Sequence, residues 1–271
     1  MDFKLPVREQ NSNKGTFGKV LNVAGSENYI GAAYLSSFAA LKIGSGYVAL
    51  ASGKNIIDSV SKLLPEVVFI SRNEGLKKFN DYDVYLIGCG LGQNFISKYW
   101  FKKFHSKLQH TNKSVVIDAD GLNLLSKLHI QLPKNCVITP HPAEAARLLK
   151  VEVKDVLENL NDSAKKLSEK YNCVTVLKTH RTVVCSQNGE IYVNEHGNSA
   201  LAKAGTGDVL AGIIAGLLSQ KMHIFEAAKL GVYLHSIAGE IASQELTEYS
   251  VLASDLVKYL PQAIKEVSQQ P

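Results

Sequence analysis

Residues 198–216 read NSALAKAGTGDVLAGIIAG, a stretch that joins a glycine-rich turn to the start of an apolar helix. The turn is Gly205-Thr206-Gly207. The residues after it have the apolar spacing of a helix, at Leu210, Ile213, Ile214 and Leu217. Because the first N–H groups of a helix have no partner within it, they face the turn. The stretch therefore predicts an anion hole made by Gly205, Thr206 and Gly207.

Asp208 lies in the first turn of this predicted helix, beside the position of the anion. Glycines let a phosphate approach the backbone, and the helix dipole adds partial positive charge where a phosphoryl group is negative. A carboxylate there can take the proton of an attacking hydroxyl as the new P–O bond forms. Asp208 is therefore the candidate catalytic base. The alternative is structural, because an N-cap at Thr206 and an acid in the first turn are common in helices.

Outside this stretch, short β-branched runs alternate with longer helical patterns, which is typical of parallel strands joined by crossover helices. Several runs are apolar throughout, as buried parallel strands are. The predicted strands cover residues 19–24, 47–51, 67–70, 84–88, 114–118, 136–139 and 174–178. We therefore predict an α/β fold of three layers, with a mainly parallel central sheet flanked by helices.

The pattern changes late in the chain, where two more strands are predicted at 182–186 and 191–194. They flank Asn188-Gly189, and such a pair between apolar runs is a strong hairpin signal. An antiparallel hairpin at the sheet edge is therefore predicted, with three helices after it. The helix at 227–241 has an apolar stripe at Leu230, Leu234, Ile237 and Ile241.

The polar segment 151–171 predicts one surface helix rather than a linker. Its apolar side consists of Leu157, Leu160, Ala164 and Leu167. The chain has no internal repeat and no convincing domain boundary, and its 271 residues suit one large α/β domain. We therefore predict a single domain over residues 1–271.

Composition excludes several classes of protein. Hydrophobic residues make up 45% and charged residues 20%, which is ordinary globular usage and argues against disorder. The net charge of +5 comes from scattered lysines, which favours anionic small molecules over nucleic acid. No run reaches the roughly 18 apolar residues of a membrane span. The four cysteines, Cys89, Cys136, Cys173 and Cys185, are far apart, which predicts buried thiols in a reducing compartment and a cytoplasmic protein.

Chemistry-bearing residues follow several predicted strands, and ligands of open α/β sheets lie beyond the carboxyl ends of strands. Residues 88–92 are glycine-rich, so they either let phosphate or ribose approach or make a tight turn. His141 stands between Pro140 and Pro142, which hold it at the same rim, although a plain surface histidine is the alternative. Of the acids that follow the strand 114–118, Asp118 or Asp120 either holds water or magnesium, or Asp120-Gly121 simply forms a turn, and Asp118 is the candidate taken here.

The stretch 204–208 resembles the Gly-x-Gly-Asp anion-hole motif of the ribokinase-like superfamily, and the longer run 197–210 more narrowly resembles the NAD(P)H-hydrate dehydratase family. Residues 14–18, followed by Ala24-Gly25-Ser26 and Gly31-Ala32-Ala33, resemble that family's opening. Residues 139–144 resemble its strand-end motif. Residues 88–92 resemble its Gly-Pro-Gly-Leu-Gly loop, with Cys89 where proline is more common. The resemblance covers nearly the whole chain.

This resemblance implies a ribokinase-like fold and a lyase that uses ATP or ADP, with Mg²⁺, to return hydrated NADH and NADPH (NADHX and NADPHX) to NADH and NADPH. It implies that the hydrated dinucleotide is bound by Ala32, Gly90, His141 and Asp208. It implies that the nucleotide is bound by Lys178, Thr179, His180, Arg181, Thr182 and Gly207. Glu144 and Asp118 would order Mg²⁺ through water. A homotetramer and a separate epimerase in the same pathway are further implications.

Two alternatives remain open on the sequence. One is a small-molecule kinase of the same superfamily, of the hydroxymethylpyrimidine or hydroxyethylthiazole type, and the other is an inactive nucleotide-binding regulator. The chain lacks the Gly-x-x-x-x-Gly-Lys-Ser/Thr pattern, which disfavours a P-loop enzyme. It also lacks a Gly-x-Gly-x-x-Gly that opens a βαβ unit, which argues against NAD as a redox cofactor.

Overall fold

One sheet of nine strands runs through the computed structural model, which describes residues 3–128 and 130–269. The strand order is β3-β2-β1-β4-β5-β6-β7-β8-β9. The strands are β1 Lys19–Val23, β2 Tyr47–Ser52, β3 Val68–Ser71, β4 Val84–Ile87, β5 Ser114–Ile117, β6 Cys136–Ile138, β7 Val174–Leu177, β8 Val183–Cys185 and β9 Ile191–Val193. Strands β1 to β7 pair in parallel, whereas β8 is antiparallel to both β7 and β9. The predicted mainly parallel sheet with an antiparallel edge hairpin is confirmed. Residues 1–2, 129 and 270–271 of the predicted domain lie outside the described residues.

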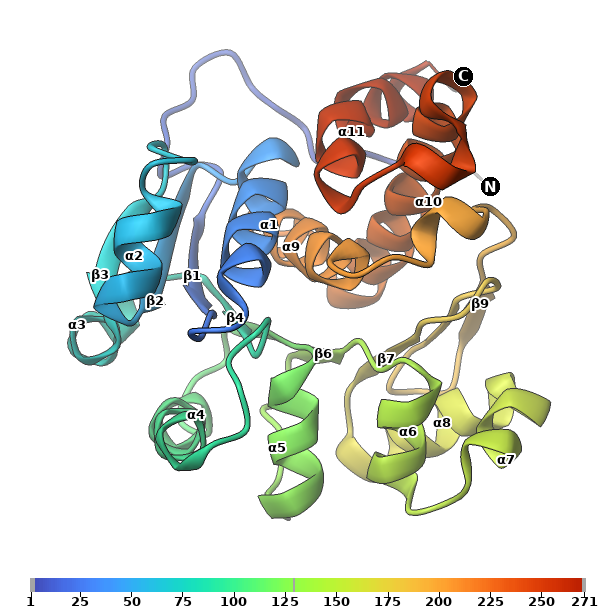
Figure 1. Ribbon diagram of the computed structural model, residues 1–271, viewed down its shortest axis with the longest axis horizontal. Helices are drawn as coiled ribbons and strands as arrows, with labels where there is room; N and C mark the ends of the chain where they lie inside the picture. The colour runs from blue at the N-terminus through green and yellow to red at the C-terminus, as the bar shows by residue number, and fades with distance from the viewer. Residues whose placement is uncertain (1–2, 129, 270–271) are drawn as a thin grey trace.

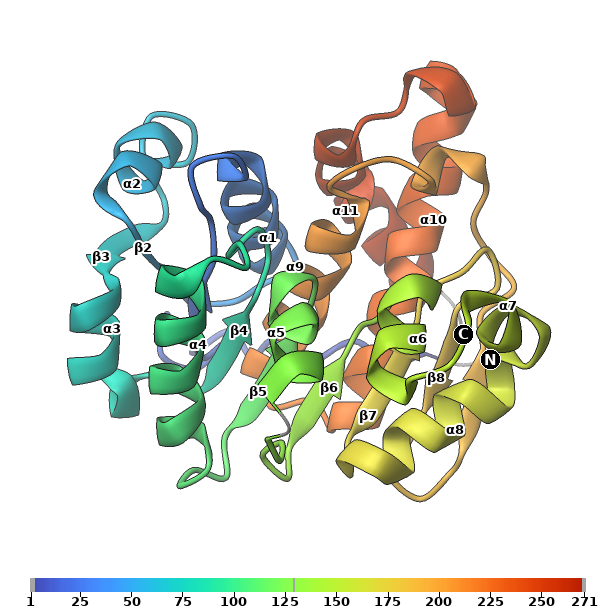
Figure 2. The same cartoon turned by 60° about the horizontal axis from the view of Figure 1, so that its bottom comes forward.

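Helices cover both faces of the sheet, which makes the three predicted layers (Figure 1). One face carries α1 Ile30–Lys42, α2 Lys54–Val60, α9 Thr206–Ser219, α10 Ile224–Ser250 and α11 Ala253–Ser268. The other carries α3 Arg72–Lys77, α4 Phe95–Leu108, α5 Asp120–Leu128, α6 Pro142–Leu149, α7 Val153–Glu158 and α8 Leu160–Tyr171. Figure 2 shows α3, α4, α5, α6 and α8 along the front of the sheet.

The two layers of helices explain why the central strands are mostly apolar on both faces. Successive residues of a strand point to opposite faces. In β1, Val20 packs in the cluster under α1 and α9, whereas Leu21 and Val23 pack in the cluster under α4 and α5. Because both faces of the central strands are buried, polar side chains there need hydrogen-bond partners, as Asn22 in β1 has in Ser36 and Ser37 of α1.

The hairpin forms where the sequence predicted it, between β8 and β9. Ser186 N donates to Glu190 O over 2.8 Å, which closes the turn. Gly189 has a φ of 82°, a left-handed conformation that glycine adopts without strain. The hairpin therefore follows from local sequence alone.

The prediction of one helix over 151–171 is wrong, because the segment forms two helices, α7 and α8. Asn159 between them has φ −137° and ψ 60°, outside the helical region. This break leaves Leu157 on α7 53% exposed, while Ala164 and Leu167 on α8 are fully buried as predicted. The amphipathic pattern was correct for the second helix only.

The predicted helix at 227–241 lies within the longer α10, where Leu230, Leu234 and Ile237 are buried and Ile241 packs against the same core.

All four cysteines are free and buried, as predicted.

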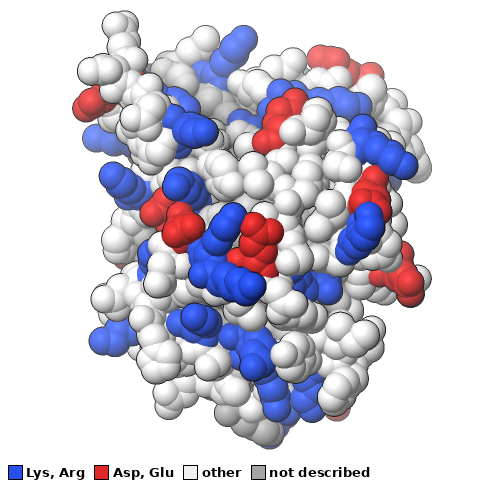
Figure 3. All heavy atoms as spheres, turned by 90° about the vertical axis from the view of Figure 1, so that its left-hand side faces the viewer, with Lys and Arg blue, Asp and Glu red and all other residues white. Residues whose placement is uncertain are grey.

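No helix formed by residues 3–128 and 130–269 is both long and apolar enough to cross a membrane. The face in Figure 3 carries basic side chains over much of its area, and several of them lie beside acidic side chains.

Candidate active site

The candidate site lies where the central parallel strands end, close to the start of α9 (Figure 1). Ile117 ends β5 and packs toward the face covered by α4 to α8, as Leu177 does at the end of β7. Because strand residues alternate between faces, the next residues, Asp118 and Lys178, point toward the face covered by α9 and α10. The sheet thereby brings together two ionisable side chains that are 60 positions apart in the chain.

Asp118 and Lys178 form a buried ion pair. Lys178 Nζ donates to Asp118 Oδ1 over 2.6 Å, and the two side chains are 19% and 2% exposed. Burial alone lowers the pKa of Lys178, but Asp118 and then Glu144 outweigh burial and raise this pKa above its ordinary value. Lys178 therefore stays cationic and can meet a phosphate as a point charge.

Gly205 sets the start of α9. Its φ of 93° is left-handed, and a Cβ at this position would lie 2.6 Å from Leu35 Cδ1. Only glycine fits here without strain. The proposed structural alternative for Thr206 is wrong, because Gly205 occupies the N-cap and Thr206 Oγ1 donates backwards to the carbonyls of Leu201 and Lys203.

The free amides of this helix start belong to Gly207 and Asp208. Within residues 3–128 and 130–269, no acceptor takes a hydrogen bond from either N–H. A Cβ on Gly207 would lie 3.3 Å from Lys178 Nζ and 3.8 Å from Asp118 Oδ2. A phosphate held by these amides would therefore lie beside the lysine, where backbone and side-chain positive charge combine.

Asp208 is partly exposed in the first turn of α9. Burial raises the pKa of Asp208 to about 7, the negative charge of Asp118 adds to the rise, and a hydrogen bond with Cys89 opposes it. The Sγ of Cys89 and one carboxylate oxygen each of Asp118 and Asp208 all lie within 4.8 Å of one another. A carboxylate that titrates near neutral pH has the property required of a general base.

The glycine-rich loop 88–92 is held by its neighbours even though Cys89 replaces the more common proline. Gly25 N donates to Cys89 O over 2.9 Å, and Gly92 N donates to Asp120 Oδ2 over 2.8 Å. These bonds hold the loop to the segments that follow β1 and β5. Hydrogen bonding here supplies the rigidity that proline would otherwise give.

Gly90 and Ala32, both predicted to bind the dinucleotide, lie side by side. Gly90 has a φ of 58°, and a Cβ on it would lie 2.7 Å from Ala32 Cβ. Ser26 Oγ donates to Gly90 O over 2.8 Å and anchors the loop to the start of α1. Because Cys89 precedes Gly90 and contacts Asp208, this pair lies next to the candidate base.

His141 and Glu144 lie at the start of α6, and both interact electrostatically with the Asp118–Lys178 pair. His141 N donates to Glu144 Oε2 over 2.9 Å, and His141 Nδ1 accepts from Ala143 N over 3.2 Å, which forms a capping box. Burial and then Lys178 lower the pKa of His141, so its ring is neutral at pH 7 with the proton on Nε2. Burial also raises the pKa of Glu144 to about 7.

A cavity of about 680 Å³ opens beside the start of α9. Its lining includes five of the residues predicted to contact nucleotide, Lys178, Thr179, His180, Thr182 and Gly207. The sixth, Arg181, lines a separate surface groove with residues of α7 and α8. Thr182 Oγ1 donates to Thr179 O over 3.0 Å, so this hydroxyl closes the turn.

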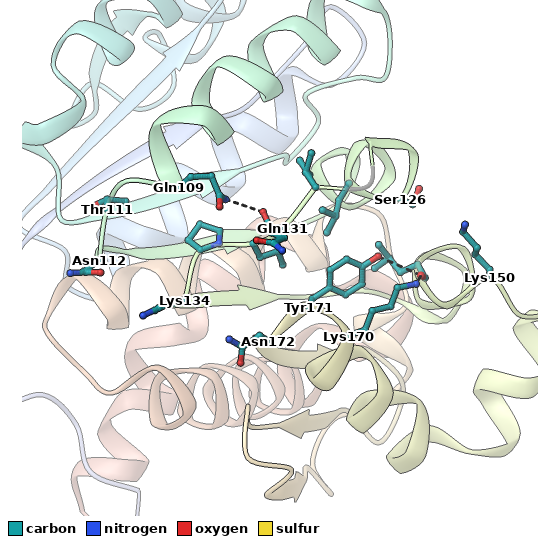
Figure 4. A pocket seen from close by; sticks show the side chains of 15 residues that line it. Gln109, Thr111, Asn112, Ser126, Gln131, Lys134, Lys150, Lys170, Tyr171 and Asn172 are labelled. Carbon is teal, nitrogen blue, oxygen red and sulfur yellow. Dashed lines mark hydrogen bonds between the residues drawn. The ribbon is translucent and has the colours of Figure 1, made fainter.

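A second cavity, of about 720 Å³, lies at the opposite end of the sheet (Figure 4). Asn112, Lys134 and Asn172 in its lining precede β5, β6 and β7, so it opens at the amino ends of those strands. No predicted site residue lines it. The predicted chemistry is therefore confined to the carboxyl end of the sheet.

A sequence model of the NAD(P)H-hydrate dehydratase family matches residues 20–262, which include the glycine loop, both strand ends and the start of α9. The chain belongs to this family. The ADP-dependent (S)-NAD(P)H-hydrate dehydratase of Neisseria meningitidis is 39% identical over 244 residues, which cover 88% of this chain and 81% of that protein.

Solved dehydratase structures share the fold of this family member. The ADP/ATP-dependent NAD(P)H-hydrate dehydratase of Bacillus subtilis, co-crystallised with ATP and Mg²⁺, aligns with a TM-score of 0.86 at 32% identity. The alignment covers 97% of this chain and 94% of the other. The bifunctional NAD(P)H-hydrate repair enzyme of Moorella thermoacetica is 34% identical, and this chain spans about half (53%) of its length.

The dehydratase site offers ligands suited to Mg²⁺. This ion prefers carboxylate and water oxygens. Asp118 and Asp208 supply carboxylates beside the anion hole, and Glu144 interacts electrostatically with Asp118 and Lys178. Burial raises the pKa of the Cys89 thiol well above its usual range and keeps it protonated. The hard oxygen donors fit the ion, and the neutral thiol does not compete for it.

Sequence reasoning missed several residues that line the dehydratase cavity. Asn198 and Ser199 do so, and they stand in the same run as the anion hole, so the motif itself could have indicated them. His196, His235 and Ser236 also line it. His235 and Ser236 come from the middle of α10, where no local sequence signal distinguishes a cavity residue from core.

Proposed function

We propose that this chain is an ATP- or ADP-dependent NAD(P)H-hydrate dehydratase, which returns hydrated NADH and NADPH to the reduced dinucleotides. The observation that carries the proposal is the position of Asp208. Its carboxylate, with a pKa of about 7, stands beside two free helix amides and the Lys178 ammonium. A base and a phosphate site are thus adjacent, as phosphoryl transfer to an alcohol requires.

In the proposed reaction, Asp208 accepts the proton of the hydroxyl on the hydrated ring. The hydroxyl oxygen forms a bond to the terminal phosphorus of the nucleotide, and the bond from that phosphorus to the leaving nucleotide breaks. The amides of Gly207 and Asp208 and the ammonium of Lys178 offset the negative charge of the transferring group. Phosphate and a ring proton then leave, and the ring double bond returns.

The remaining site residues divide between the two substrates. We place the nucleotide in the 680 Å³ cavity against Lys178, Thr179, His180, Thr182 and Gly207. Arg181 faces a different groove, which gives no support for a nucleotide contact.

We place the hydrated dinucleotide against Ala32, Gly90 and His141. Asp118 and Glu144 would order Mg²⁺ through water, and the ion would offset negative charge on the nucleotide phosphates.

The direct test is recovery of reduced nicotinamide. Hydrated NADH is incubated with the protein, Mg²⁺ and either ADP or ATP, and the near-ultraviolet absorbance of NADH is followed. We expect absorbance to return only when nucleotide and Mg²⁺ are both present. Absence of recovery with either nucleotide, in a folded protein that binds nucleotide, would refute the proposal.

The same assay addresses the kinase alternative. A kinase releases a stable phosphate ester, so nucleotide would be consumed with a hydroxymethylpyrimidine or hydroxyethylthiazole substrate while hydrated NADH stayed unchanged. Family membership favours the dehydratase, since the matched family is described as NAD(P)H-hydrate dehydratase.

We further propose that residues 1–271 form one domain, which the continuous nine-stranded sheet supports. The four free buried thiols support a reducing compartment such as the cytoplasm. The family resemblance supports a homotetramer and a separate epimerase acting in the same pathway. Sedimentation of the purified chain tests the oligomer, and a mass of one chain would exclude it.

A further inference from the structure

His235 is a buried histidine that the proposed reaction does not use. It comes from the middle of α10 and is 7% exposed. Its Nε2 lies 2.9 Å from the carbonyl oxygen of Thr206, the first residue of α9. The same ring lines the cavity that holds Gly207. A side chain distant in sequence therefore touches the backbone of the anion hole.

The direction of this hydrogen bond is fixed by chemistry. A carbonyl oxygen can only accept, so the proton must be on Nε2. Burial lowers the pKa of His235 to about 4, although the bond to Thr206 opposes the change, so the ring is neutral at pH 7. His235 is thus a neutral donor to Thr206 O.

The Thr206 carbonyl and the Gly207 N–H belong to one peptide unit. This unit is planar, and its C=O and N–H point in opposite directions, so a bond that fixes the carbonyl also fixes the N–H. Donation into the carbonyl also polarises the amide and strengthens its N–H as a donor. The Gly207 N–H is one of the two free amides of the helix start.

We propose that His235 is a positioning residue, which aims and strengthens the Gly207 N–H for the transferring phosphoryl group by holding the Thr206–Gly207 peptide. This inference rests on the proposed phosphoryl transfer at that site. The contact of His235 is with the backbone of Thr206, on the side of the peptide away from the Gly207 amide.

The test compares two substitutions, His235→Leu, which removes the donor, and His235→Gln, whose Nε2 can replace it. Loss of an oxyanion donor costs about 10² to 10³ in kcat, so a misaligned donor in His235→Leu should lower kcat by at least about tenfold. The KM for nucleotide should change by less than about threefold, because the interaction strengthens in the transition state. His235→Gln should recover most of the lost kcat.

Leu234→Val is the matched control for disturbance of α10. Leu234 is fully buried on the same helix and is not among the residues that line the cavity. We expect this variant to lower Tm and leave kcat near that of the wild type. The proposal is overturned if His235→Leu keeps wild-type kcat, or if His235→Gln is as impaired as His235→Leu.

A second measurement does not depend on dehydration. In ¹⁵N-labelled protein, the Gly207 amide resonance should shift on addition of ADP and Mg²⁺, and this shift should be smaller in His235→Leu than in His235→Gln. If the Gly207 shifts differ between the two variants as expected, but the wild type leaves hydrated NADH unchanged, the proposed function fails while the positioning role stands. An equal Gly207 shift in both variants overturns the positioning role itself.

Discussion

At the scale of single residues, the site is a balance of charges in a partly buried space. Asp118 is neutralised by Lys178 at 2.6 Å, whereas Asp208 has no cation at hydrogen-bond distance among the described residues. Burial therefore dominates at Asp208 and raises its pKa to about 7, while Lys178 is held cationic. Two aspartates a few ångströms apart thus acquire different chemistry from their surroundings.

Replacement of Asp208, the candidate base, should leave nucleotide binding intact and slow the dehydration reaction. Asp208→Asn should fold, bind nucleotide and lose at least about a hundredfold in kcat, as loss of a general base does. Initial rates of NADH recovery measure the effect. Asp162→Asn, an acid-to-amide change on the exposed surface of α8, is the control and should leave the rate unchanged. Near-normal turnover by Asp208→Asn would remove Asp208 from the central role.

The pH dependence of the wild type follows from the same carboxyl group. Asp208 must be deprotonated to accept the hydroxyl proton, and burial raises its pKa to about 7. The kcat/KM should therefore increase with pH and level off above about pH 7, because this constant reports groups of the free enzyme. A rate profile taken at constant Mg²⁺ and ionic strength measures this. A profile that stays flat between about pH 5.5 and 8 would contradict the assignment.

At the scale of elements, the start of α9 forms the anion hole of the site. Gly205 is the N-cap of the helix, and the Thr206 hydroxyl donates a hydrogen bond to the carbonyl of Leu201 in the preceding turn. Gly207 has no side chain, which leaves space beside Lys178. The other site residues come from strand ends, where a parallel sheet presents them at one rim. The helix supplies the anion hole, and the strands supply the charged side chains.

Gly205→Ala tests the geometry of this helix start. A left-handed alanine costs about 1 to 2 kcal/mol, and its Cβ would lie 2.6 Å from Leu35 Cδ1, so stability and kcat should both fall. Gly189→Ala is a matched control, because Gly189 also has a positive φ but its Cβ would meet no atom within 4 Å. Thermal unfolding should show a loss in both variants. Equal activity of the two variants would contradict the importance of the helix start.

At the scale of the whole molecule, the sheet brings distant segments to one cavity. The Asp118–Lys178 pair spans 60 positions, and the bond from His235 to Thr206 spans 29. The site therefore exists only when the sheet and both of its helical layers are assembled.

Nucleotide binding should stabilise the whole fold for this reason. A ligand at a hundred times its Kd adds about 2.7 kcal/mol to the free energy of unfolding, which should raise Tm by roughly 5 °C or more. Thermal unfolding with ATP and Mg²⁺ measures the shift. Adenosine, which has no phosphates for the anion hole, should give a smaller one. The same increase with adenosine would place the main binding energy away from Gly207.

Much of the fold could be predicted because its signals are local. Apolar runs indicated the parallel strands, and Asn188-Gly189 indicated the hairpin, since turn chemistry depends on adjacent residues. The division of 151–171 into two helices was missed because Asn159 is compatible with a helix by pattern alone. Arg181 was grouped with its sequence neighbours, although the turn directs it to another groove.

The sequence by itself determined the class of fold, the anion-hole turn and Asp208 as the candidate base, because each depends on residues within one short segment. Only the tertiary structure decided the Asp118–Lys178 pair, the raised pKa of Asp208 and the contact of His235 with the helix start. Those properties arise from burial and from distances between side chains on different elements. Such distances are set when the layers pack, so no local pattern of residues specifies them.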